Sequence, residues 1–301
     1  MSCPRQNRRA TLFCLLLISV GSLSVAASAA KTNDLQHSIV LRTDSPNREI
    51  APRDLGITAD GRRGSIVSVV DASETPLSIA LVIDAGPDQF AALNREKLLA
   101  SSLIAEFSDT TTEFIVIRAG DQATNIAAGS VGSIALSSLQ ALSVETGHKS
   151  QIPIYKAVVL AIDELSLRPG IRVLVILAEG NDSRSGIGYK QLRASAQAQH
   201  VAVLTVLVAD HSARGSKATL RYGWDLRSLA GDTAGAFVDN DRNTPRLVNR
   251  LAQTIRSLRL VTFELEGVSP GQHRMHTSSN SVARLHAQKE VFVVGPDCEC
   301  C

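Results

Sequence analysis

The chain has 301 residues, of which 44% are hydrophobic and 20% are charged, and its formal net charge is +2. This length is sufficient to bury a large hydrophobic core in one or two domains. The near-neutral charge, with no basic stripe that carries interleaved aromatic residues, argues against a nucleic-acid partner.

The first 29 residues have the pattern of a secretory signal peptide. Three arginines precede an apolar run at 12–25, and the small residues 27–29 follow as a cleavage site. The apolar run is too short and too rich in serine for a membrane span. We therefore expect an exported protein, periplasmic or extracellular, whose mature chain has no integral membrane span. Retention of the segment as an N-terminal anchor is the alternative.

Residues 31–75 are predicted to form a β prelude that contains a hairpin. Apolar and polar residues alternate on both sides of Asp60-Gly61, with Ile57 before this dipeptide and residues 66–70 after it. An Asp-Gly pair between two alternating segments is a strong signal for a two-residue hairpin turn.

Residues 76–258 are predicted to form one α/β domain, because buried strands now alternate with helices. The strands are expected at 79–83, 114–117, 173–177 and 201–208. The helices are expected at 90–107, 155–167, 189–199, 226–230 and 244–258. This alternation indicates a doubly wound, mostly parallel sheet with small β extensions before and after it. On the first helix, Glu96 and Lys97 are expected to lie outside the apolar face.

The chain after residue 258 returns to β structure, and 259–297 is predicted to be an antiparallel extension. The tail 298–301 contains the cysteines that remain once the signal peptide is removed, Cys298, Cys300 and Cys301. Because the mature chain has no cysteine elsewhere, a disulfide in the core is excluded. The tail forms one local bridge with an odd thiol, links chains into a disulfide-linked oligomer, captures a metal ion or is an unpaired end.

Acidic residues follow three of the predicted strands, at Asp84, Glu179 and Asp210. Since the carboxyl ends of parallel strands meet at one edge of a sheet, these residues mark the edge where ligands are expected to bind. Carboxylates that converge there would suit a hard cation such as Ca²⁺ or Mg²⁺. Loops that face solvent are also commonly acidic, so the spacing alone leaves both interpretations open.

The run Pro76-Leu77-Ser78-Ile79-Ala80-Leu81-Val82-Ile83-Asp84 resembles the first strand of a von Willebrand factor type A domain. It is most similar to the exported, acidobacterial-type branch of that superfamily. A similar stretch precedes this run at 54–61, and others follow it in the family's order at 154–157, 173–182 and 229–237. The resemblance therefore covers roughly residues 53–294. It implies a Rossmann-like fold and a metal-ion-dependent adhesion site, in which an Asp-x-Ser-x-Ser loop, a threonine and a second aspartate hold Mg²⁺ or Mn²⁺.

The residues at those positions indicate that the adhesion site is degenerate. Asp84 matches the first aspartate, but Gly86 and Asp88 stand where the family has serines. Ile152 stands at the threonine and Glu179 at the second aspartate. Because glycine and isoleucine offer no ligand oxygen, we expect no bound metal and no other cofactor. A calcium-like site made by Asp84, Asp88 and Glu179 is the alternative.

The sequence therefore predicts a non-enzymatic module that binds an unidentified protein partner. The expected binding surface comprises Asp84, Gly86, Asp88, Gln151, Ile152, Glu179, Asn181 and Asp182. A module that depends on a divalent cation is the second hypothesis. A hydrolase is the weakest, because the serines and the seven histidines share no catalytic motif. His273 and His276 are expected to lie on the polar face of β-strands, in preference to acting as zinc ligands.

Overall fold

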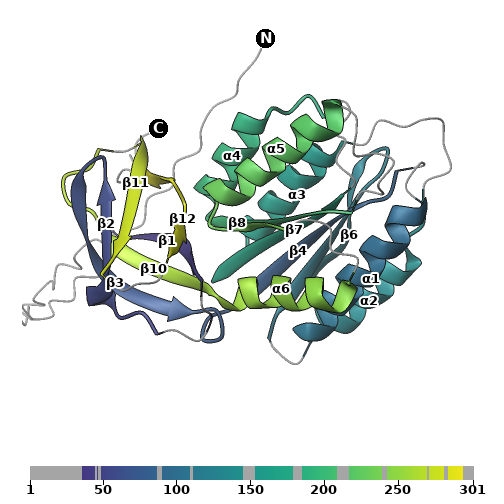
Figure 1. The fold of residues 1–301 in the computed structure, drawn as a ribbon, viewed down its shortest axis with the longest axis horizontal. Helices are drawn as coiled ribbons and strands as arrows, with labels where there is room; N and C mark the ends of the chain where they lie inside the picture. The colour runs from purple at the N-terminus through teal and green to yellow at the C-terminus, as the bar shows by residue number, and fades with distance from the viewer. Residues whose placement is uncertain are drawn as a thin grey trace, which may run out of the picture. The chain divides into compact units, whose positions relative to one another are not determined.

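The computed structural model describes residues 36–44, 46, 49–86, 90–108, 111–144, 153–178, 185–208, 217–238, 243–269, 271–280 and 284–293. These residues form two β-sheets and six α-helices (Figure 1), so the predicted mixed α/β class is confirmed. The predicted signal peptide and the cysteine tail lie outside the described residues.

The first sheet has six strands in the order β6-β5-β4-β7-β8-β9. Its strands are β4 (Leu77–Asp84), β5 (Glu113–Ala119), β6 (Ala123–Ser130), β7 (Ile171–Ala178), β8 (Val201–Leu207) and β9 (Ala236–Val238). All neighbouring pairs are parallel except β5 and β6. We call it the parallel sheet. Every residue of β4 is buried, as expected for a strand covered on both faces.

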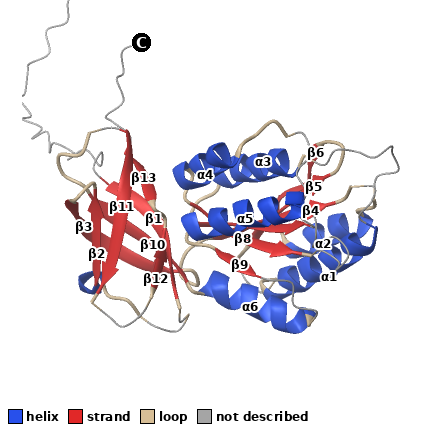
Figure 2. Ribbon diagram, turned by 45° about the horizontal axis from the view of Figure 1, so that its top comes forward, coloured by secondary structure: helices blue, strands red, loops and turns tan. Residues whose placement is uncertain are grey.

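Helices cover both faces of the parallel sheet (Figure 2). On one face lie α1 (Phe90–Glu106), α2 (Gly132–Ala141) and α6 (Thr244–Arg256). On the other lie α3 (Ile154–Ser166), α4 (Tyr189–Ala198) and α5 (Lys217–Asp232). Side chains of β4 alternate between the two layers, so that Leu81 packs in the first and Val82 in the second. Among the described residues, no helix is both long and apolar enough to cross a membrane.

The second sheet has seven antiparallel strands in the order β12-β1-β10-β3-β2-β11-β13. Its strands are β1 (Gln36–Thr43), β2 (Leu55–Ala59), β3 (Arg62–Asp71), β10 (Leu258–Glu264), β11 (Gly271–Ser279), β12 (Leu285–Ala287) and β13 (Glu290–Val293). Only Gln288 and Lys289 separate the edge strands β12 and β13. The sheet must therefore curl until its edges approach each other, which makes it a near-barrel around Ile39, Ile57 and Phe263.

The strands before and after the α/β segment belong to this one near-barrel. After the helices, β10 returns to pair with both β1 and β3, across more than 180 residues of sequence. The expectation of a doubly wound sheet with small β extensions is therefore too simple, because more than half of the strands form a separate antiparallel sheet. An alternating pattern predicts a half-buried strand, but it does not identify the strand's partner.

The hairpin predicted at Asp60-Gly61 is confirmed. Strands β2 and β3 pair directly across this dipeptide, with Ala59 opposite Arg62. Both turn residues have positive φ, +48° at Asp60 and +83° at Gly61, as a type I′ turn requires.

Candidate functional site

The parallel sheet has a point at which its strand order reverses. Numbered along the chain, its six strands run 3-2-1-4-5-6, so the reversal falls between β4 and β7. In open α/β sheets, ligands bind at this switch point, outside the carboxyl ends of the strands. Strand β4 ends there at Asp84 and β7 ends beside it at Ala178. We call this place the switch edge.

Asp84 at the switch edge is fully buried, with 0% of its surface exposed. Its Oδ1 accepts a hydrogen bond from the backbone N–H of Gly86 at 3.2 Å. The next residue, Ala85, donates its backbone N–H to the carbonyl of Ala119 at 2.8 Å. The Asp84 carboxyl thus acts inside the protein, where it shapes the first turn of the loop that follows β4.

Glu96 on α1 also reaches the switch edge, which corrects the expectation that it lies outside the apolar face. Its side chain is fully buried, and its Oε2 accepts the backbone N–H of Asp84 at 2.9 Å. Glu96 lies three residues after Leu93 and four before Ala100, both buried on the same helix. This spacing places it on the core face, and a helical count that ignored residue polarity would have found it.

Asp84 and Glu96 together place two carboxyl groups in the interior at the end of β4. A buried carboxylate is tolerated only when hydrogen bonds or opposite charge replace its water. Each accepts a backbone N–H, and both residues make further interactions as well. Across the described part of the chain, no group of three His, Cys, Asp or Glu side chains is arranged to hold a metal ion.

The structure describes two residues of the predicted binding surface, Asp84 and Gly86, and brings them together in one turn. The rest of that surface lies outside the described residues, as does Asp210. These positions are Asp88, Gln151, Ile152, Glu179, Asn181 and Asp182. The described chain resumes at Pro153, directly before α3, and at Ser185, before α4.

His273 lies on β11 of the near-barrel, and both nitrogens of its ring have hydrogen-bond partners. Its Nδ1 lies 2.8 Å from Oδ2 of Asp60 and its Nε2 lies 2.7 Å from the carbonyl oxygen of Ser269. The hydrogen bond between Asp60 and His273, together with one from the backbone N–H of Arg274, lowers the pKa of the Asp60 carboxyl. Both ring nitrogens are engaged. The expectation that His273 lies on the polar face of its strand is wrong, because His273 is buried on the same face of β11 as Met275, whereas His276 is exposed.

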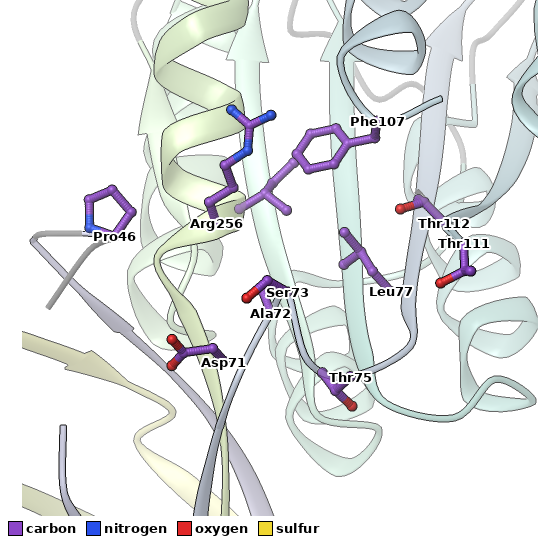
Figure 3. A pocket seen from close by; sticks show the side chains of 11 residues that line it. Pro46, Asp71, Ala72, Ser73, Thr75, Leu77, Phe107, Thr111, Thr112 and Arg256 are labelled. Carbon is purple, nitrogen blue, oxygen red and sulfur yellow. The ribbon is translucent and has the colours of Figure 1, made fainter. Parts of the chain in front are cut away.

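A cavity of about 290 Å³ lies away from the switch edge, near the amino ends of β4 and β5 (Figure 3). Leu77, Phe107 and Ile255 form its apolar wall, and Thr111 and Arg256 are among its polar lining. This cavity was not predicted from the sequence, because its residues come from separate stretches of the chain, at 46, 71–77, 107–112 and 255–256, and form no motif.

No protein-family model matches the chain, and no curated protein matches it. Among solved structures, BatB from Bacteroides thetaiotaomicron is similar, with 15% identity and a TM-score of 0.49 over 60% of this chain and 97% of that one. The PilB minor pilin from Streptococcus sanguinis has 9% identity and a TM-score of 0.48, over 61% and 62% of the two chains. A von Willebrand factor type A protein from Catenulispora acidiphila has 11% identity and a TM-score of 0.45, over 86% and 75%. All three scores lie below 0.5, so these similarities do not assign the chain to a family.

Proposed function

We propose that this chain is an exported, non-enzymatic module that binds a protein partner through the loops at the switch edge. In this proposal the parallel sheet is a doubly wound domain of the von Willebrand factor A type. The observation that carries it is the strand order 3-2-1-4-5-6, which puts the end of β4 at the switch point of the sheet. The family-like sequence at 76–84 ends at that same position.

Binding without a metal ion is part of the proposal. In the family's adhesion site, the first aspartate and two serines face the ion together. Here Asp84 is fully buried and holds the N–H of Gly86, and Gly86 has no side-chain oxygen to offer at the first serine position. The described residues therefore do not fit the family's magnesium site, which supports an interface made by protein atoms alone.

An affinity capture tests the location of the interface. The chain from residue 30 to 301 serves as bait in the exported fraction of the source cells, beside a double variant, Asn181→Arg with Asp182→Arg. We expect the wild type to retain a partner that the double variant loses. The control is Asp163→Arg, which replaces a carboxylate by a guanidinium, as Asp182→Arg does, at an exposed position of α3. Equal capture by wild type and double variant would contradict the proposal.

A cation-dependent module is the second candidate, and Glu96 is the observation that favours it. This residue adds a second buried carboxyl beside Asp84, and Ca²⁺ accepts six to eight oxygen ligands in irregular geometry. Calorimetric titration with Ca²⁺, Mg²⁺ and Mn²⁺ separates the candidates. Metal-independent binding predicts neither heat nor a thermal shift up to millimolar concentrations. Saturable binding that is lost in Glu96→Gln would instead establish the cation site.

A further inference from the structure

The cavity near the amino ends of β4 and β5 is built where the chain passes between the two sheets. The turn after β3 supplies Ser73, the start of β4 supplies Leu77, and the segment before β5 supplies Thr111. Phe107 follows the end of α1, and Arg256 is the last residue of α6. The walls of the cavity are therefore formed by the ends of several helices and strands.

The charged groups at the cavity are balanced within the protein. Asp71 is paired with the buried guanidinium of Arg259, which also donates to the carbonyl of Pro46 at 2.7 Å. Arg256 pairs with Glu106, at 2.8 Å between Nη2 and Oε1. Two carboxylates and two guanidinium groups therefore neutralise one another, and neither an anion nor a cation meets an excess of opposite charge.

The remaining lining offers an apolar wall and hydroxyl groups. The Arg256 guanidinium lies 5.2 Å from the centre of the Phe107 ring, so the arginine covers the aromatic face. Figure 3 shows the hydroxyl oxygens of Thr111 and Thr112 directed toward the space they share with Leu77. Among the described residues, the Ser73 and Thr111 hydroxyls have no hydrogen-bond partner. A hydroxyl both donates and accepts, so it matches another hydroxyl in either role.

We propose that this cavity binds an uncharged, hydroxyl-bearing molecule of about the size of a monosaccharide. Its volume of about 290 Å³ lies at the lower end of the range for small-molecule sites, which admits one small ring. The Leu77 side packs against the apolar face of the ring, while Ser73 and Thr111 form hydrogen bonds with its hydroxyls. The proposal is independent of protein binding at the switch edge, since it uses none of the same residues.

Calorimetric titration of the full chain tests the proposal. The probes are D-glucose, D-galactose and myo-inositol, with D-glucuronate and D-glucosamine as charged counterparts. We expect at least one neutral probe to bind saturably with a Kd on the order of millimolar, the range for a ligand of about a dozen non-hydrogen atoms. The charged counterparts should bind at least about tenfold more weakly, because the cavity gives them no unpaired partner.

Two tryptophan variants locate the binding. Thr111→Trp fills the cavity from an exposed position, so the fold is preserved and binding is expected to disappear. Thr124→Trp, at an exposed position of β6, should bind as the wild type does. Thermal melting of both variants verifies that they are folded. The proposal is overturned if no neutral probe binds, if a charged counterpart binds more tightly, or if Thr111→Trp retains binding.

Discussion

Glu96 shows how one residue connects a helix to the switch edge. Its carboxylate accepts the N–H of Asp84 from within the core, where water cannot replace it. Glu96→Ala should lower the free energy of unfolding by about 1–3 kcal/mol, because a buried amide loses its acceptor. Glu96→Gln keeps an oxygen in place and should cost less. Urea unfolding measures both, with Glu106→Ala as the exposed control on α1. Equal losses in the Ala and Gln variants would contradict this role for the carboxylate.

Asp60 gives a pH dependence that belongs to a single side chain. The hydrogen bond with His273 lowers the pKa of the carboxyl in the folded protein. The ionised form therefore stabilises the fold above the unfolded pKa, near 3.9, and this stabilisation disappears as pH falls through the lowered folded value. Asp60→Asn should make the loss of stability below about pH 4 shallower. Thermal melts from pH 6 to pH 2 measure this, with Asp163→Asn as control, and parallel profiles would refute it.

At the scale of elements, the sequence predicted the strands best where they are buried on both faces. Strands β4 and β7 contain continuous apolar runs at 79–83 and 173–177, and Thr205 is the one polar residue of β8, so the positions of these strands followed directly from the residues. Strand β6 was not predicted, since it is a partly exposed edge strand of small and polar residues without a clear hydrophobic period. Helix α2 was not predicted either. Helix α5 begins at Lys217, well before the predicted start at 226. The prediction was too short because Gly223, within the helix, has a low helix propensity.

The type I′ turn between β2 and β3 yields an element-scale prediction. Gly61 has φ +83°, where a Cβ atom is strained. Gly61→Ala should therefore destabilise the protein by roughly 1–2 kcal/mol. Gly223→Ala is the matched change inside α5, where alanine meets only ordinary contact with Leu207 and should stabilise by roughly 0.5–1 kcal/mol. Chemical unfolding compares the two, and effects of the same sign would contradict the assigned turn.

For the molecule as a whole, pairing between distant segments is what the sequence could not supply. The near-barrel joins β1 and β3 to β10. The chain leaves the near-barrel after β3 and returns to it at β10, and these two crossings are joined where Ala72 donates its N–H to the carbonyl of Leu258 at 3.2 Å. The hydrophobic periodicity of a segment describes each strand alone. It therefore predicted neither the pairing of β1 and β3 with β10 nor the cavity beside these crossings. The switch edge was predictable in position, because Asp84 ends a buried strand. Most of its loop residues lie outside the described chain.

Arg259 connects the segments of the chain that cross between the two sheets, and its replacement is expected to destabilise the whole molecule. Its guanidinium is 1% exposed, pairs with Asp71 and donates to the carbonyls of Pro46 and Arg256. Arg259→Leu should cost about 3 kcal/mol, the lower part of the range for breaking a buried pair, because Asp71 keeps partial access to water. Arg256→Leu, which breaks an exposed pair, should cost about 1 kcal/mol or less. Calorimetric unfolding that ranks the two variants in the opposite order would contradict this assignment.

The location of the protein interface is the central claim, and hydrogen exchange with the captured partner tests it most directly. Exchange of backbone amides is followed by mass spectrometry in the free chain and in the complex, with EDTA present in both. We predict slower exchange at 84–89, 147–153 and 179–185, and unchanged exchange in the near-barrel. Protection confined to the near-barrel or to the amino ends of β4 and β5, with the three switch-edge segments unchanged, would contradict the account.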